Sequence, residues 1–151
     1  MHVKTDLWAG ALLGTLAASV VVNLGETVVH GIVLAAEWKA AVALLGKTLD
    51  TSLGAWAFIV ASNSLHCAAV VGLGALLRQR GESTLKAAVV AGTAVWVVGW
   101  VAPTIGSLPL QLFPLRLSGI MLAVGLAELI VAAFVGQWVY RRCTGLNERA
   151  I

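Results

Sequence analysis

The sequence has little charge. Of its 151 residues only 11% are charged, whereas 60% are hydrophobic. A soluble domain averages about 25% charged and roughly 45–50% apolar residues, because a small domain has a large surface to cover. So few charges, set between long apolar runs, exclude an ordinary soluble enzyme, a nucleic-acid-binding protein and a disordered chain. The composition predicts a protein that crosses a lipid bilayer several times.

Cysteines and catalytic motifs are equally scarce. Cys67 falls at mid-membrane and Cys143 just past the last apolar run, so we expect two free thiols rather than a disulfide. The sequence has no Gly-x-Ser-x-Gly, His-Glu-x-x-His or Cys-x-x-Cys motif and no glycine-rich phosphate loop. Little sequence remains outside the apolar runs to build an active site. We therefore expect a protein that is not an enzyme.

Four apolar runs are each long enough to cross a bilayer as a helix. They cover about 7–34, 53–77, 85–105 and 117–140. The expected fold class is therefore an all-α, polytopic four-helix bundle that forms one transmembrane domain over 1–151. Segment 35–51 predicts a short interfacial helix after the first span. Asp50, Thr51 and Ser52 are candidate N-caps for the second span.

The connections predict both a proline-rich segment and an orientation. All three prolines lie in segment 103–116, which is too apolar for a solvated loop and too rich in proline for a helix. We expect it to fold onto the outer membrane surface or onto a partner. The cations divide seven to three, which predicts cytoplasmic termini by the positive-inside rule. The seven are Lys4, Arg78, Arg80, Lys86, Arg141, Arg142 and Arg149, and the three are Lys39, Lys47 and Arg116.

Polar side chains inside the spans form the candidate site, because they are costly in a bilayer and usually face the bundle interior. At 1.5 Å per residue, His66 lies about 20 Å below the outer end of its span and Glu128 about 17 Å. Asn23 and Glu26 lie about 17 and 12 Å down in the first span, and His30 only about 6 Å. These depths predict a shared layer. The predicted polar core consists of Asn23, Glu26, Asn63, His66 and Glu128.

Four interpretations of this constellation stay open. The first is a set of buried pairs, Glu26 with His30 and His66 with Glu128, that fix helix register. The second is a metal site made by these same four residues, although the Glu-x-x-His spacing of di-metal bundles is missing. The third is a tetrapyrrole held by His66 or His30 alone, because their depths differ by about 14 Å. The fourth is a path for protons or small solutes with Glu128 as the titrating group. No cofactor is predicted outright.

Rows of small residues four apart allow helices to approach closely in lipid. They favour packing within one chain or docking against another chain. Trp96 and Trp100, one turn apart in the third span, are expected to face lipid or fill the core rather than hold a cofactor. The rows are Gly10-Gly14-Ala18, Ser64-Ala68-Gly72 and Gly119-Ala123-Ala127.

Short motifs carry a resemblance. His30-Gly31 near the end of the first span, an interfacial stretch with an aromatic residue, a proline-containing third connection and Glu128 in the last span resemble features of small uncharacterised four-span bacterial inner-membrane proteins. The resemblance implies a four-span bundle in the bacterial inner membrane and no assigned activity. Together with the missing motifs, it predicts a non-catalytic accessory subunit of a larger bacterial membrane complex, for example a respiratory or photosynthetic one. The expected partners are the lipid bilayer and other membrane subunits.

Overall fold

The computed structural model describes the backbone of residues 2–145 and the side chains of residues 7–145. This part of the chain is all-α, as expected. Short π-helical and 3-10 segments, labelled η, interrupt or extend the longer helices. In chain order the elements are α1 (His2–Val28), η1 (Val29–Val33), α2 (Ala35–Leu44), α3 (Leu53–Gln79), α4 (Thr84–Trp96), η2 (Val97–Val101), α5 (Ala102–Ser107), η3 (Leu108–Leu110) and α6 (Leu115–Thr144).

Four of the helical stretches are long and apolar enough to cross a membrane. Many large apolar side chains point outward along them, among them Leu12, Phe58 and Leu65. Such exposure would be unfavourable in water but is ordinary in lipid. The predicted four-span architecture of a membrane protein is confirmed. The stretches are Leu7–Val33, Leu53–Gln79, Thr84–Leu110 and Leu115–Thr144.

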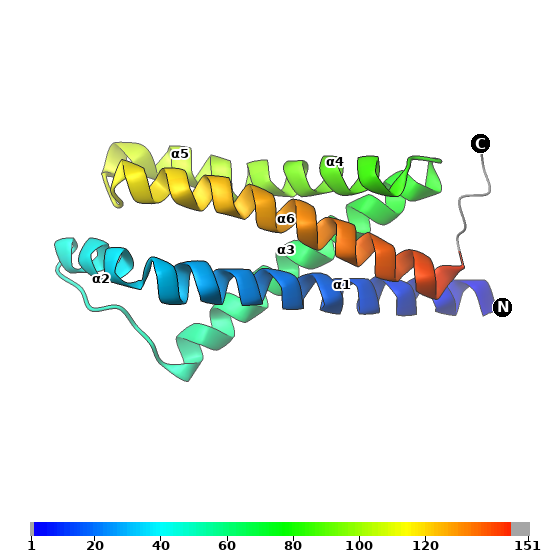
Figure 1. Cartoon of the computed structure of the whole chain (residues 1–151), viewed down its shortest axis with the longest axis horizontal. Helices are drawn as coiled ribbons and strands as arrows, with labels where there is room; N and C mark the ends of the chain where they lie inside the picture. Colours follow the sequence, from blue (N-terminus) through cyan, green and yellow to red (C-terminus); the bar gives the residue numbers. More distant parts are fainter. Residues whose placement is uncertain (1, 146–151) are drawn as a thin grey trace.

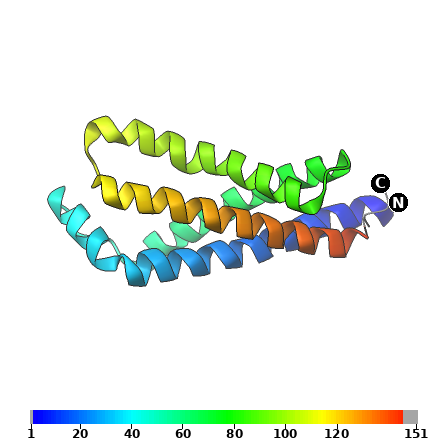
Figure 2. The ribbon, with the colours of Figure 1, turned by 45° about the horizontal axis from the view of Figure 1, so that its top comes forward.

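The bundle has two distinct ends (Figure 1). At one end lie the start of α1, the turn between α3 and α4 and the end of α6. At the other end lie α2, α5 and the turn into α6, and Figure 2 shows the same arrangement after rotation. We call these the termini end and the α2 end. The short helix expected after the first span is present as α2.

Glycines let the helices approach closely around α6, which contacts α1, α3 and α4. A Cβ added at Gly14 would lie 2.7 Å from the carbonyl oxygen of Gly136, and one added at Gly92 would lie 3.2 Å from Cα of Ile130. These positions admit no side chain, so α1 and α4 pack directly on the α6 backbone. The row containing Gly10 and Gly14 is therefore used within the chain.

Serine hydroxyls begin α3 and α4. The Ser52 hydroxyl accepts a hydrogen bond from the Ala55 N–H at 3.2 Å, and Ser83 does the same for Lys86. Each satisfies a backbone donor that the first helical turn leaves unpaired. Of the three candidate N-caps for the second span, the structure selects Ser52.

The expectation for segment 103–116 was partly wrong. The third span does not end at 105 but continues through Pro103 and Pro109 to Leu110. Pro103 is tolerated because it lies in the first turn of α5, directly after η2, where a missing N–H breaks no regular α-helical hydrogen bond. Only the short turn that follows leaves the helix, and its Phe113 packs on Trp38 of α2. The segment thus folds onto this chain's own surface helix.

Candidate functional site

Two carboxyl groups meet inside the bundle. The Glu128 carboxyl of α6 rests on the backbone of Gly25, the residue before Glu26 in α1, and the two acids are close enough to interact. Both carboxyl oxygens of Glu128 are inaccessible to solvent, and no N–H or O–H donor in residues 7–145 reaches them. Ionised carboxylates only accept hydrogen bonds, so this contact is a bond only when one of the two carries a proton. The two acids were predicted to share a layer, and they do.

Gly25 makes room for this pair. A Cβ added at Gly25 would overlap the Glu128 carboxyl group and lie 2.9 Å from its Cδ. The acid on α6 therefore rests directly on the α1 backbone, one residue before Glu26. A side chain at position 25 would push the two carboxyls apart. Nothing in the sequence distinguishes Gly25 from the other glycines of the apolar runs, so this role could not be predicted.

His30 extends the pair toward the α2 end. Its Nε2 lies 3.6 Å from Oε2 of Glu26, and its Nδ1 accepts a hydrogen bond from the Trp38 indole N–H at 3.0 Å. Because Nδ1 accepts, the neutral ring in this arrangement carries its proton on Nε2, facing Glu26. The predicted Glu26–His30 pair is confirmed. Trp38, which lies in the segment predicted to form the interfacial helix, fixes the His30 tautomer.

A π-helical turn and α2 hold Trp38 in place. In η1 the Leu34 N–H bonds the Val29 carbonyl at 2.8 Å, which closes a wider turn than an α-helix has. Beyond it, the ring of Trp38 meets the edge of Phe113, with 5.4 Å between centroids. Leu117 of α6 is buried against the same cluster. The surface helix is thus anchored to both α1 and α6.

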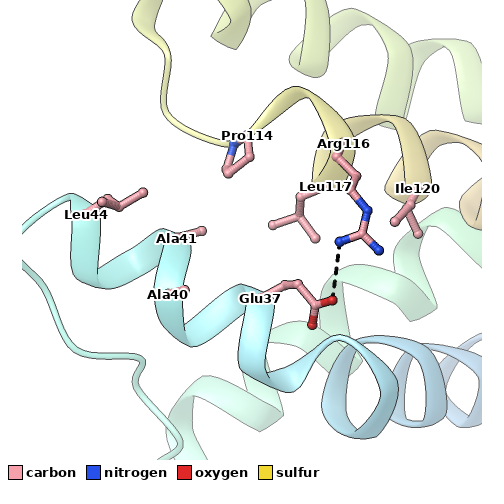
Figure 3. A pocket seen from close by; sticks show the side chains of 8 residues that line it. All are labelled: Glu37, Ala40, Ala41, Leu44, Pro114, Arg116, Leu117 and Ile120. Atoms are coloured by element: carbon pink, nitrogen blue, oxygen red, sulfur yellow. Dashed lines mark ion pairs between the residues drawn. The ribbon is translucent and has the colours of Figure 1, made fainter.

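A groove lies beside this anchor, between α2 and the start of α6 (Figure 3). Its volume is about 210 Å³ and its lining is mostly aliphatic. Glu37 and Arg116 face each other across it, with 3.6 Å between Oε1 and Nη1. The Arg116 side chain is largely exposed and that of Glu37 partly so, and the pair therefore contributes little to stability. The groove has no titratable group beyond this pair.

His66 does not join the acids, contrary to the predicted His66–Glu128 pair. Its Nδ1 lies 2.9 Å from the carbonyl oxygen of Ser62, which can only accept, so Nδ1 carries the proton. The ring meets Trp100 edge-on at 4.7 Å, and its Nε2 faces Gly99. The depth estimate placed His66 at the right height, but helix rotation turns it toward η2 instead of α6.

Asn23 and Asn63 form a separate polar contact between α1 and α3. The Asn63 amide donates to Oδ1 of Asn23 at 3.2 Å, and the Asn23 amide donates to the Ser19 carbonyl at 2.8 Å. Cys67 lies beside Ser19 in the same cluster. The bond between the two asparagines ties α1 and α3 together. The predicted polar core is therefore two neighbouring clusters plus His66, rather than one layer.

The sequence-based analysis missed Gln137. Its side chain is 1% exposed, and its amide donates to the Val71 carbonyl of α3 at 2.9 Å. A Cβ at Gly74 would overlap this amide, so the glycine opposite creates its space. No motif in the sequence singled this residue out. The tryptophans of the third span fill the core as expected, with the Trp96 indole bonded to the Leu122 carbonyl at 2.9 Å.

These positions bear on the ligand alternatives. Among residues 7–145, no three His, Cys, Asp or Glu side chains cluster closely enough to hold a metal ion. His30 and His66 belong to different clusters, and Trp38 or Trp100 lies against each ring. Cys67 and Cys143 are free thiols, as expected. The arrangement best suited to chemistry is the chain of titratable groups from His30 through Glu26 to Glu128.

Comparison with protein-family models, curated proteins and solved structures finds no match. The protein class is therefore defined by the fold alone: an all-α bundle with four helices able to span a membrane.

Proposed function

We propose that this chain is a small, non-catalytic subunit that packs, within the bacterial inner membrane, against a larger membrane complex. The observation that carries the proposal is that two of its small-residue rows have no partner within the part of the chain that the structure describes. Ala68 and Gly72 on α3 are exposed, as are Gly119, Ala123 and Ala127 on α6. A Cβ added at Gly72 or Gly119 would meet nothing within 4 Å.

Such rows favour contact with another helix. Lipid chains are as apolar as leucine, so helices associate in a bilayer mainly where backbones can approach closely. Gly14 shows this use within the bundle, where it lies against Gly136. An equivalent row left facing outward offers the same close approach to a neighbouring subunit.

The proposed orientation places both termini in the cytoplasm. It is supported by five cations at the termini end, near the ends of α3 and α6 and the start of α4: Arg78, Arg80, Lys86, Arg141 and Arg142. Lys39, Lys47 and Arg116 lie toward the α2 end. Single cysteines in a cysteine-free background test this. We expect position 47 to react with an impermeant reagent in intact cells and position 80 not to, and the reverse pattern would overturn the orientation.

Association is tested by glycine substitution. Gly72→Leu and Gly119→Leu should leave the monomer folded, because the added side chain meets open space, but should block close approach to a partner. Gly54→Leu at the start of α3 is the matched control, since an added Cβ there would meet only Ser52 Oγ at 3.8 Å and the residues four positions away, Asp50 and Phe58, are not small. Extraction in mild detergents should recover a larger assembly with the wild type and with the control. Recovery of only monomer from wild-type cells in several mild detergents would refute the proposal.

A further inference from the structure

We propose that Glu26 and Glu128 together bind a single proton inside the bundle, and that His30 is the group through which this proton exchanges at the α2 end. This inference does not rest on the accessory role. Its starting point is the Glu128 carboxyl, which is buried against Gly25, next to Glu26, and which no N–H or O–H donor from residues 7–145 reaches. Two ionised carboxylates in contact repel strongly, so the pair is expected to share one proton and one negative charge.

The surroundings favour a proton over a larger cation. Hard metal cations take six or more oxygen ligands, and no three His, Cys, Asp or Glu side chains in the described residues lie close enough together to hold a metal ion. The Glu128 carboxyl already fills the space above Gly25, where even one added carbon would lie 2.9 Å from Cδ. A proton between two oxygens occupies no additional volume.

Other titratable groups on the packed helices are already engaged elsewhere. On α3, His66 bonds the Ser62 carbonyl and Cys67 lies beside Ser19. On α4, Lys86 pairs with Glu82 at the termini end, with 2.8 Å between Nζ and Oε2. Elements η2, α5 and η3 carry no charged residue. His30 is thus the titratable group that contacts the acid pair from outside it.

Exposure shows from which side a proton reaches the pair. The side chains of His30 and Glu26 are 16% and 20% exposed, whereas the Glu128 oxygens are essentially inaccessible, so a proton enters from the Glu26 side, where His30 lies 3.6 Å away. Proton uptake at Nδ1 would give an imidazolium, which then releases its Nε2 proton to the ionised Glu26 and becomes neutral again. Charge and protons balance in this step, and water at the α2 end supplies the proton. Proton uptake at Nδ1 of His30 is blocked while the Trp38 indole N–H donates to that nitrogen. The Trp38 indole therefore acts as the gate.

Infrared spectroscopy of the purified full-length protein tests the shared proton. At neutral pH, where exposed carboxylates are ionised, we expect the carbonyl band of one protonated carboxyl. Glu128→Gln and Glu26→Gln should each abolish it, because the new amide donates to the remaining carboxylate and replaces the proton. Glu37→Gln, at an exposed carboxylate outside the pair, should leave it unchanged. Absence of the band in the wild type, as a bound cation would produce, or its survival in both variants, would overturn the proposal.

Exchange into D2O tests the route, read as the isotope shift of the same band. His30→Phe should slow the exchange, because it removes the relay. Trp38→Phe should accelerate it, because it frees Nδ1 of His30. His66→Phe is the matched control and should leave the rate unchanged. A merely structural role for His30 and Trp38 predicts that both variants loosen the site and speed exchange together, so faster exchange in His30→Phe would overturn the assigned route.

Discussion

The two halves of the bundle are held together differently. Toward the termini end, α1 and α6 meet backbone to backbone at Gly14 and Gly136, and the buried Gln137 has a fixed donor contact to Val71. Toward the α2 end, the same helices meet where Glu128 rests on Gly25 beside Glu26, and two acids this close attract each other only when one of them is protonated. The first half depends on shape and the second on protonation state. This difference indicates that the first half is the structural anchor and the second the part able to respond to conditions.

Gly14→Leu should give the largest loss of stability. The side chain would enter the α6 backbone at the Gly136 carbonyl, 2.7 Å from the new Cβ, and overpacking of this kind costs about 3 kcal/mol. Unfolding in mixed detergent micelles, followed by circular dichroism, measures it. Gly72→Leu, in open space, should change stability by less than about 0.5 kcal/mol. Equal losses in the two variants would mean that the α1–α6 contact is not the anchor.

Glu128→Leu should have the next largest effect. It leaves Glu26 with His30 alone, and a largely buried polar group that loses a partner costs about 1–3 kcal/mol. Glu128→Gln should cost less, since its amide can donate to Glu26. The same unfolding assay compares the two variants. A Glu128→Leu protein as stable as the wild type would show that no group in the α2 half depends on this acid.

Trp38→Phe should cost about 1 kcal/mol. It removes the hydrogen bond to Nδ1 of His30 but keeps an aromatic ring against Phe113. Trp56→Phe is the control, because the Trp56 indole makes no hydrogen bond within residues 7–145 and its ring packs at Gly31. Thermal denaturation should give a lower melting temperature for Trp38→Phe than for Trp56→Phe. The opposite ranking would mean that ring volume, and not the hydrogen bond, holds α2.

The smallest effect is expected outside the spans, at Asp50. Its carboxylate accepts the Ser52 N–H at 2.8 Å, and that backbone bond, with the Ser52 hydroxyl, lowers the pKa of Asp50 below its ordinary value. A carboxyl with a lowered pKa in the folded state adds to the stability of the fold at pH values above the ordinary Asp pKa of about 3.9. This added stability is lost as the pH falls through the pKa of the folded state. Asp50→Asn should therefore differ slightly from the wild type at pH 6 and converge with it in acid. A difference that grows toward low pH would contradict this sign.

The sequence alone predicted what depends on length and hydrophobicity. The four spans, the short helix before Asp50 and the serine cap follow from apolar runs and local capping, which do not depend on distant residues. The similar depth of Glu26 and Glu128 could also be predicted, because depth along a helix follows from counting residues. The continuation of the third span past Pro103 could not be predicted, because it depends on a π-helical turn that no sequence pattern here indicates.

Helix rotation limited the rest. His66 and Glu128 have matching depths, but depth says nothing about which way a side chain faces around its axis. The role of Gln137 was hidden for the same reason, because Gly74 makes its site from the opposite helix. Tertiary packing sets rotation, and one sequence gives only weak evidence of packing where all faces are apolar.

The π-helical turn at Val29–Val33 also determines where α1 can change in length. Each residue of a regular α-helix advances the chain by about 1.5 Å and about 100°, so deleting one residue elsewhere in α1 would rotate the part of the chain that follows by nearly a third of a circle. A π turn holds one more residue than an α turn. Deleting one residue within Val29–Val33 would therefore let this turn close as an α turn and would leave the direction of α2 nearly unchanged. Trp38 would stay near His30 after that deletion, whereas a deletion in the middle of α1 would separate them.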